Sequence, residues 1–316
     1  MRCFVTGGAG FIGSHLVDEL LEKGYKVTVF DDLSSGRKEF IQHHLNNKNF
    51  SFIEADLLDF NLLNREIKEH DVVFHIAANP DVRIGMQKPE VAKKDILITY
   101  NVLDAMRENN IKKIVFSSSS TVYGETPPIP LPENYGPLLP ISVYGAAKLA
   151  CEGLISSFSH TFDMQSWIFR FANVIGKRGT HGVIVDFINK LKKNSKELEI
   201  LGNGKQKKNY LYIKDCIDGI VFGFENSKEQ INLFNLGSHD ATEVTRIAEM
   251  VVEEMGLKKV RFKYTGGDRG WKGDIPRFQF DITKIEKLGW KPKYDSDEAV
   301  RKAIKDLIEE LGSVSL

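Results

Sequence analysis

The chain has only three cysteines in 316 residues, and none of them indicates a disulfide or a metal site. Cys3, Cys151 and Cys216 are scattered and lack the close spacing of metal ligands. Cys3 lies in an apolar strand pattern, and the other two lie in helical patterns. We therefore expect reduced structural thiols and no bound metal.

The chain also lacks an excess of either charge and a long apolar run. Its 43 basic and 43 acidic residues give a formal net charge of zero, which argues against nucleic acid or an anionic membrane as the main partner. No apolar run reaches membrane-spanning length, and the apolar start breaks at residues 6–10, unlike a secretory signal. We expect a soluble cytoplasmic protein without a membrane partner.

In the first half of the chain, short apolar runs alternate with amphipathic segments. This alternation is typical of a parallel sheet with helices on both faces, the Rossmann-type doubly wound α/β class. The predicted strands are residues 2–6, 26–31, 50–55, 71–76, 113–117 and 167–171. The predicted helices are residues 11–23, 58–70, 90–109 and 144–161.

The alternation of strand and helix patterns ends after Asn173, and helical patterns dominate from there on. The predicted helices are residues 183–193, 214–225, 242–255 and 297–311, the predicted strands 197–201, 210–212, 234–236 and 260–264, and the predicted loops 176–182, 202–209 and 266–276. We expect a Rossmann-type domain over residues 1–172 plus a returning segment 213–240. A smaller α/β substrate domain is expected over residues 173–212 and 241–316.

A glycine-rich turn follows the first predicted strand and opens a helix. Gly7 permits a tight turn, Gly10 lets the backbone approach a pyrophosphate, and Gly13 allows the helix to pack closely on the strand. The second predicted strand ends in Asp31, which can accept hydrogen bonds from ribose hydroxyls and repels a 2′-phosphate. The pattern therefore predicts NAD, rather than NADP, as the cofactor.

Three further residues in the first half of the chain have two interpretations each. Arg37 can hold a phosphate, although a solvent-exposed arginine is favoured. Asp56 can flank an adenine with Leu57, or it can cap the following helix, and the two interpretations are evenly matched. His75 ends the fourth predicted strand, where a structural role is favoured over a catalytic one.

Tyr144 and Lys148 stand four residues apart in a predicted helix, so their side chains share one face. A nearby ammonium, together with an oxidised nicotinamide, favours the phenolate and lowers the tyrosine pKa toward that of a general base. The fifth predicted strand leads into hydroxyl residues 117–121, one of which can orient a reacting hydroxyl. Combined with the glycine turn, this pattern predicts oxidation and reduction of a hydroxyl group.

With these features the chain resembles the extended short-chain dehydrogenase/reductase family, and within it the branch of UDP-glucose 4-epimerases. The resemblance implies interconversion of UDP-glucose and UDP-galactose through a transient 4-keto sugar with bound NAD, by a homodimer. It covers nearly the whole chain and rests on residues 7–13 (G-G-A-G-F-I-G), 30–36 (F-D-D-L-S-S-G), 75–78 (H-I-A-A), 117–124 (S-S-S-S-T-V-Y-G), 144–148 (Y-G-A-A-K), 170–176 (R-F-A-N-V-I-G), 181–184 (H-G-V-I), 202–206 (G-N-G-K-Q) and 267–274 (G-D-R-G-W-K-G-D).

The resemblance also implies roles for single residues. Tyr144 is expected to be the general base and acid, Lys148 its partner, and Ser119 the catalytic hydroxyl. Besides Tyr144 and Lys148, the expected cofactor-binding residues are Gly7, Gly10, Phe11, Ile12, Gly13, Asp31, Asp32, Ser34, Ser35, Gly36, Asp56, Leu57, Ile76, Ala77, Ala78, Ser117 and Phe171. The expected substrate-binding residues are Arg83, Ser119, Thr121, Asn173, Val183, Phe187, Lys208, Arg269, Asp274 and Phe278. Arg83 is included because its loop lies near the expected nicotinamide end, and a solvated arginine is an equally favoured interpretation.

The chain departs from the family's pattern at three places. Lys208 and Asn209 replace a frequent Arg-Asp, which weakens the expected grip on the diphosphate because lysine lacks the bidentate fork. Asp95 stands where asparagine is common, and Ser120 where alanine is common. Phe278 is interpreted as setting the width of the sugar pocket, with an ordinary core residue as the alternative.

The segment at residues 119–121 carries hydroxyls and no carboxylate. Related dehydratases and decarboxylases of nucleotide sugars carry acidic residues there, so the expected reaction is 4-epimerisation. The alternatives are another NAD-dependent nucleotide-sugar epimerase, acting on an N-acetylhexosamine or a uronate, and a reductase of the same family. A non-catalytic NAD-binding regulator is the alternative from another class.

Overall fold

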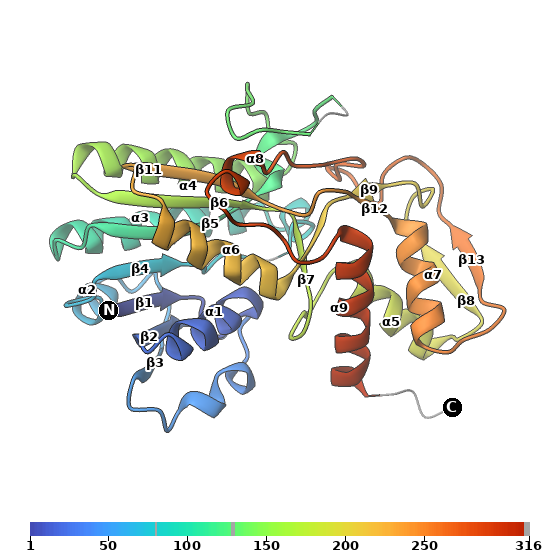
Figure 1. The fold of residues 1–316 in the computed structure, drawn as a ribbon, viewed down its shortest axis with the longest axis horizontal. Coiled ribbons are helices and arrows are strands. Elements are labelled where there is room, and N and C mark those ends of the chain that lie inside the picture. The colour runs from blue at the N-terminus through green and yellow to red at the C-terminus, as the bar shows by residue number, and fades with distance from the viewer. Residues whose placement is uncertain (80, 128–129, 313–316) are drawn as a thin grey trace. The chain divides into compact units, whose positions relative to one another are not determined.

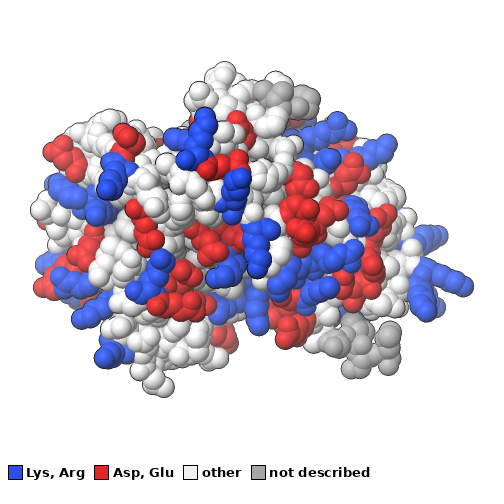
Figure 2. Space-filling model, in the orientation of Figure 1, with Lys and Arg blue, Asp and Glu red and all other residues white. Residues whose placement is uncertain are grey.

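The computed structural model describes residues 1–79, 81–127 and 130–312, and the chain divides into two compact units. The first unit comprises Met1–Tyr123, Leu138–Arg170 and Ile220–Phe234. The second comprises Gly124–Pro137, Phe171–Gly219 and Asn235–Leu316. Within the described residues, no helix is long and apolar enough to cross a membrane. Figure 2 shows both signs of charge interspersed over the face that it draws, in keeping with the zero net charge.

A sheet of seven described strands forms the centre of the first unit (Figure 1). Its order is β11-β6-β5-β4-β1-β2-β3, and the pairs from β5 to β3 are parallel. The order reverses between β1 and β4, which is the doubly wound Rossmann-type topology expected from the sequence. Ligands of such sheets bind at the carboxyl ends of the strands at this reversal. The strands are β1 (Arg2–Thr6), β2 (Lys26–Asp31), β3 (Phe50–Glu54), β4 (Val72–His75), β5 (Lys113–Ser119), β6 (Gln165–Phe171) and β11 (Ile231–Leu236).

Helices α2 (Phe60–Glu66), α3 (Glu90–Glu108) and α4 (Val143–Thr161) share one apolar core with the sheet. Phe4 and Val73 from the strands, Val102 from α3 and Ile155 from α4 are all fully buried in it. Burying each such side chain stabilises the fold by about 1.5–3 kcal/mol. Helix α1 (Phe11–Glu22) packs against β1 and β2, and Figure 1 shows it in front of these strands.

The second unit is built from short strand pairs and helices. The parallel pairs are β7 (Asn173–Ile175) with β10 (Tyr210–Tyr212) and β8 (Glu197–Ile200) with β13 (Arg261–Tyr264), and β9 (Lys207–Lys208) pairs antiparallel with β12 (Thr242–Glu243). Helices α5 (Val183–Lys193), α7 (Val244–Glu254) and α9 (Ser296–Leu311) bury their apolar faces in a common core. The remaining helices are α6 (Ile213–Asn226), which contributes to both units, and α8 (Thr283–Glu286).

Several predicted elements have other bounds in the structure. The predicted helix 58–70 is reduced to α2, because Asp59 caps that helix at its start. The predicted loop 202–209 contains β9, and the predicted helix 242–255 begins with β12, so the two segments pair. The predicted strand 234–236 is the end of β11, which belongs to the large sheet. Short 3-10 helices add η1 (Lys38–Phe40), η2 (Gln42–His44), η3 (Ile84–Met86) and η4 (Ser120–Tyr123).

Candidate active site

The glycine turn between β1 and α1 has no room for side chains. Gly7 has a φ of +70°, and a Cβ atom there would lie 2.6 Å from the backbone nitrogen of Ala77. A Cβ atom at Gly13 would lie 2.0 Å from the carbonyl oxygen of Gly7. Gly10 is the N-cap of α1 and brings no capping side chain, so the first backbone N–H groups of α1 are available to an anion. The turn therefore fits the pyrophosphate of a dinucleotide.

Asp31 is fixed at the end of β2 by two backbone N–H groups. Its Oδ2 atom accepts a hydrogen bond from Ala9 and its Oδ1 atom one from Leu33, both at 2.9 Å. Burial raises the pKa of this carboxyl, which is 7% exposed, and the two N–H donors oppose the rise. Because a carboxylate oxygen can accept more than one hydrogen bond, Asp31 can still receive ribose hydroxyls. The residue therefore fits the adenosine ribose of NAD.

The structure bears on the two interpretations of Asp56 and of Arg37. Asp56 does not cap the following helix, because α2 begins at Phe60 and its N-cap is Asp59. The Oδ1 atom of Asp56 instead accepts a hydrogen bond from the Leu58 backbone at 3.0 Å. Arg37 is exposed, as favoured from the sequence.

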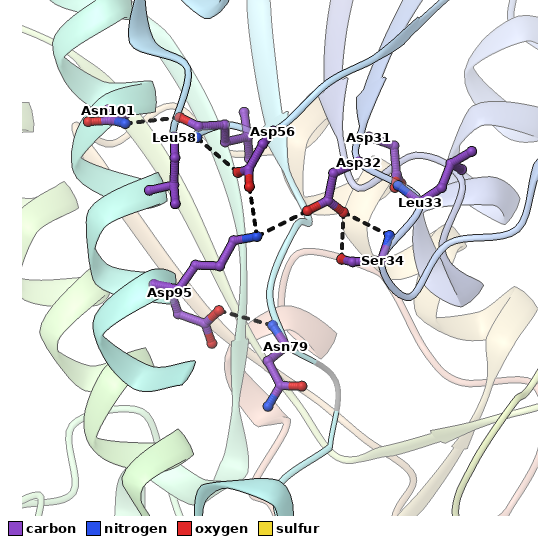
Figure 3. Close-up of polar contacts among 11 residues, drawn as sticks. Asp31, Asp32, Leu33, Ser34, Asp56, Leu58, Asn79, Asp95 and Asn101 are labelled. Carbon is purple, nitrogen blue, oxygen red and sulfur yellow. Dashed lines mark hydrogen bonds and ion pairs between the residues drawn. The ribbon is translucent and has the colours of Figure 1, made fainter. Parts of the chain in front are cut away.

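The carboxylates of Asp32 and Asp56 turn toward the same point in Figure 3. That point is the ammonium of Lys94 on α3, whose Nζ atom lies 3.0 Å from Asp32 Oδ2 and 3.0 Å from Asp56 Oδ2. The sequence analysis missed Lys94. Its partners are 62 and 38 residues away in the chain, so no local pattern signals the contact.

The other residues expected at the cofactor lie near the ends of the central strands or at the start of α1. Phe11 and Ile12 open α1, and Ser34 and Ser35 are exposed in the loop after β2. A Cβ atom at Gly36 would lie 2.8 Å from Asp31 Oδ1, so this loop passes close to the carboxylate. The remaining expected residues are Leu57 after β3, residues 76–78 after β4, Ser117 in β5 and the buried Phe171 at the end of β6.

The catalytic residues expected from the sequence gather where β5 meets α4. Lys148 is 3% exposed, donates a hydrogen bond to the Ser117 carbonyl at 2.6 Å, and lies 5.9 Å from the centre of the Tyr144 ring. The Ser119 hydroxyl oxygen accepts hydrogen bonds from the backbone N–H and the hydroxyl of Thr121, at 3.2 and 3.0 Å. Ser119 also hydrogen-bonds to Tyr144. A tyrosine, a lysine and an oriented hydroxyl therefore lie in one group.

Burial dominates the electrostatics of this group. Burial raises the pKa of Tyr144, the charge of Asp95 adds to the rise, and the hydrogen bond with Ser119 opposes it. Burial also lowers the pKa of Lys148, which Cys151 and Asp95 oppose. The lower tyrosine pKa expected from the sequence requires the ammonium and an oxidised nicotinamide together, so it stays a prediction.

A buried ion pair supports the end of β5. Glu152 on α4 accepts hydrogen bonds from Arg170 Nε at 3.0 Å, from Arg170 Nη2 at 2.7 Å and from the Ser118 hydroxyl at 2.5 Å. The Arg170 guanidinium also lies 4.7 Å from the centre of the Tyr123 ring. These contacts tie β5, α4 and β6 together, and Ser118 brings the serine run itself into the network. The sequence analysis missed this pair, because its partners lie in different elements.

Two further residues on this side of the sheet are buried and polar. His75 is fully buried, with Nδ1 2.8 Å from the Thr6 hydroxyl and Nε2 3.0 Å from the Thr99 hydroxyl. Burial lowers its pKa to about 3, which fits the structural role favoured from the sequence. Asp95 on α3 is buried and accepts a hydrogen bond from the Asn79 backbone at 3.0 Å. Burial raises the pKa of Asp95, and Asn79, Lys148 and Lys94 oppose the rise.

In the second unit, carboxylates hold the two cations expected at the diphosphate. Lys208 pairs with Asp274 and lies 4.9 Å from the centre of the Trp271 ring. Arg269 pairs with Glu125 and donates a hydrogen bond to the Asp274 carbonyl at 3.1 Å. Glu125 and Trp271 were not anticipated from the sequence, because nothing in their own segments marks them as partners.

The other expected substrate residues take no part in these ion pairs. Asn173 begins β7 and donates a hydrogen bond to the Asn209 carbonyl at 3.1 Å, whereas Val183 and the buried Phe187 lie on α5. Phe278 is buried and packs edge to face on Phe280, with ring centres 4.6 Å apart. A buried ring suits a closed pocket and a core equally, so this contact leaves both interpretations of Phe278 open. In the first unit, Thr121 is half-buried, and Arg83 is exposed and pairs with Asp81 at 3.7 Å.

Comparisons with known proteins identify the family. The model of the NAD dependent epimerase/dehydratase family matches residues 3–237. A putative UDP-glucose 4-epimerase of Methanocaldococcus jannaschii is 36% identical over 307 residues, covering 95% of this chain and 96% of the relative. A crystal structure of a UDP-galactose 4-epimerase is 42% identical and has a TM-score of 0.88, covering 99% of this chain and 100% of that one.

A third similar protein has both a cofactor and a substrate bound. It is the UDP-glucuronic acid 4-epimerase from Bacillus cereus in complex with UDP-glucuronic acid and NAD, which is 29% identical. Its TM-score is 0.89, and the match covers 99% of this chain and 100% of that one. The expectation of NAD is thus confirmed by the family and by its solved structures. The chain therefore belongs to the NAD dependent epimerase/dehydratase family, as its resemblance to extended short-chain dehydrogenases/reductases predicts, and NAD is its cofactor.

Proposed function

We propose that the protein is a UDP-glucose 4-epimerase, which interconverts UDP-glucose and UDP-galactose through a transient 4-keto sugar. The observation that carries the proposal is the group of Ser119, Tyr144 and Lys148 beside a serine run that has no carboxylate. Such a site can move the proton of one hydroxyl, and the serine run itself offers no carboxylate that could act as acid and base for eliminating water from neighbouring carbons. The match to sugar-nucleotide 4-epimerases over nearly the whole chain supports it further.

In this proposal the catalytic residues handle a single proton. Tyr144 takes the proton of the sugar 4-hydroxyl and later returns it, while Ser119 orients that hydroxyl by a hydrogen bond. The Lys148 ammonium lies 5.9 Å from the centre of the Tyr144 ring, and together with the positive charge of an oxidised nicotinamide it would favour the phenolate form of Tyr144. NAD, when bound, supplies the chemistry of accepting and returning the hydride. Because the hydride returns to the opposite face, the 4-keto sugar must turn within the site.

The first unit is proposed to hold NAD. The glycine turn at Gly7, Gly10 and Gly13 binds the pyrophosphate, Asp31 binds the ribose, and Asp56 with Leu57 flanks the adenine. The other residues expected from the sequence complete this site. The proposal keeps the expected domains, with NAD on residues 1–172 and 213–240 and the nucleotide sugar on the rest.

The second unit is proposed to hold the UDP moiety. Lys208 and Arg269 bind the diphosphate, and Asn173, Val183 and Phe187 contribute from β7 and α5. Both cations already face a carboxylate, so the diphosphate must replace Asp274 and Glu125 as their partner. Phe278 is proposed to narrow the sugar pocket and to disfavour an N-acetyl group.

A second candidate is 4-epimerisation of a UDP-uronate. The fold is compatible with it, because the UDP-glucuronic acid 4-epimerase matches this chain with a TM-score of 0.89 and the UDP-galactose 4-epimerase matches it with 0.88. Fold likeness thus does not separate the two sugars.

A substrate panel tests the proposal. Purified protein is incubated separately with UDP-galactose, UDP-N-acetylgalactosamine and UDP-glucuronate, and each sugar is followed by NMR. We expect UDP-glucose to form fastest. Comparable rates with the N-acetylated sugar would remove the role of Phe278, and conversion of the uronate alone would replace the proposed function by the second candidate.

We also propose a homodimer formed through α3 and α4. Leu97 and Tyr100 on α3 are 41% and 44% exposed, although both are large and apolar in character. Tyr100 packs on Phe158 of α4, so the two helices present one surface. Light scattering on the wild type and on Leu97→Glu tests this, and a monomeric wild type would contradict it.

A further inference from the structure

Each carboxylate that contacts Lys94 is shared between its own loop and the lysine. Asp32 accepts hydrogen bonds from the Ser34 backbone and hydroxyl with Oδ1 and contacts Lys94 with Oδ2. Asp56 follows the same scheme, with Oδ1 on the Leu58 backbone and Oδ2 on Lys94. Each loop thus fixes its carboxylate by one oxygen and presents the other to the lysine. We call this arrangement the Lys94 bridge (Figure 3).

The Lys94 bridge joins three elements at one end of the sheet. Asp32 follows β2 and Asp56 follows β3, and these neighbouring strands pair Asp31 with Glu54 at their ends. Lys94 reaches both loops from α3. In the proposed function, these two loops carry the groups that bind the ribose and flank the adenine. The bridge therefore fixes the spacing between two walls of one site.

The two carboxylates of Asp32 and Asp56 can lie this close together only because the Lys94 ammonium lies between them. Both carboxylate oxygens lie 3.0 Å from the same nitrogen, so they are separated by no more than twice that distance. Without the ammonium, two carboxylates this close repel each other. Burial lowers the pKa of Lys94, but hydrogen bonds and charges of Asp56 and Asp32 outweigh it and raise the pKa above its usual value. Lys94 is therefore charged at neutral pH.

We propose that Lys94 is a positioning residue for the cofactor, which holds the loops after β2 and β3 together and thereby slows the release of NAD. The inference rests on the adenosine placement in the proposed function. Lys94 and both of its partners are partly exposed, at 41%, 27% and 41%. Ion pairs of this kind contribute little to folding stability. The effect of the bridge on NAD is therefore separable from any effect on the fold.

The experiment measures NAD dissociation from the full-length protein without any sugar. Binding of NADH to the cofactor-free protein is followed by fluorescence, and NAD dissociation is followed by displacement in a stopped-flow instrument. We expect Lys94→Met to release NAD about tenfold faster, which corresponds to about 1.4 kcal/mol. Lys94→Arg keeps the charge and should release NAD at nearly the wild-type rate. Lys93→Met removes the same charge from the exposed neighbouring residue and should leave the rate unchanged.

A double variant separates repulsion from simple loss of contact. Asp32→Asn in the Lys94→Met background removes one of the two repelling charges, so NAD release should slow again relative to Lys94→Met. Asp32→Asn alone completes the cycle. The thermal midpoint of the cofactor-free protein should be the same for Lys94→Met and Lys93→Met.

Three results would overturn the inference. They are an unchanged dissociation rate in Lys94→Met, an equal acceleration in Lys93→Met, and a lowered thermal midpoint with no rescue by Lys94→Arg. A wild type that binds NAD but epimerises no sugar removes the proposed function and leaves this inference standing.

Discussion

The charged groups proposed for the cofactor and those proposed for the diphosphate are held in different ways. Asp31, Asp32 and Asp56 are fixed by backbone N–H groups of their own loops or of the glycine turn. Lys208 and Arg269 are instead held by side-chain carboxylates, which compete with any incoming anion. The aspartates are therefore already oriented for the cofactor, whereas Lys208 and Arg269 must exchange a carboxylate for the diphosphate.

This difference suits a protein that keeps its cofactor and releases its product. A preformed site binds firmly because little ordering remains to be done on binding. In the proposed function, Asp274 and Glu125 compete with the diphosphate for Lys208 and Arg269, and they would pair with these cations again when the nucleotide sugar leaves.

Tyr144→Phe should separate chemistry from cofactor binding. Removing the proposed general base and acid should lower turnover of UDP-galactose by about 10³-fold, within the range typical of such groups. NAD binding should be unchanged, because the glycine turn and Asp31 are untouched. A coupled UDP-glucose assay and NADH fluorescence measure the two quantities. Tyr25→Phe, which removes a surface hydroxyl bonded to Glu225, is the control and should keep full activity.

The stability of the first unit should fall at acidic pH because of His75. Its pKa is lowered to about 3 by burial, whereas the unfolded chain titrates near 6.5. Between these values the unfolded chain binds a proton that the folded chain does not, so stability falls as the pH falls. The full loss is about 4–5 kcal/mol at ~1.4 kcal/mol per pH unit.

Urea unfolding between pH 7 and pH 4 checks this against His75→Gln, which has no titrating ring. The wild type should lose more free energy of unfolding than the variant over this range. Parallel curves for the two proteins would mean that His75 is not the group responsible.

Gly13→Ala should break the preformed arrangement. The new Cβ atom would meet the Gly7 carbonyl oxygen, so the turn must open and its spacing for the pyrophosphate is lost. We expect NAD affinity to fall by about 100-fold, with ~1–3 kcal/mol of stability lost to overpacking. Gly153→Ala on α4 is the matched control, because its Cβ atom meets nothing within 4 Å. Equal NAD affinity in both variants would contradict the role of the turn.

The smallest effects are expected at the exchangeable ion pairs. Arg269→Gln should raise the KM for UDP-galactose about tenfold, because a charge-assisted hydrogen bond to the diphosphate is lost. Glu125→Gln should lower the KM by about threefold, because it frees Arg269 from its competitor. Glu197→Gln, at the exposed pair with Arg261, should change nothing. A rise in KM with Glu125→Gln would show that Glu125 positions Arg269 instead of competing with it.

The elements that follow from local patterns could be predicted from the sequence. Strands β1 and β2 and helix α5 have the bounds that their apolar patterns predict, because the side chains of each segment are enough to determine its structure. The glycine turn and the pairing of Tyr144 with Lys148 are local in the same sense. Their spacing along one segment already fixes their geometry.

The contacts that the sequence could not predict are long-range pairs of side chains. Lys94 with Asp32 and Asp56, Glu152 with Arg170, and Arg269 with Glu125 each join residues from different elements. A single charged residue matches many possible partners, and only the fold selects one. The rise in the Tyr144 pKa could not be predicted for the same reason, since burial and Asp95 act on it from other elements.

The most direct test of the account is the number of turnovers without added NAD. Wild-type protein is freed of unbound nucleotide by gel filtration and incubated with an excess of UDP-galactose, which is followed by NMR. A firmly held cofactor should give many turnovers per protein molecule and an equilibrium mixture of UDP-glucose and UDP-galactose. Conversion that stops after one turnover, or that requires continuous addition of NAD, would contradict a firmly held cofactor.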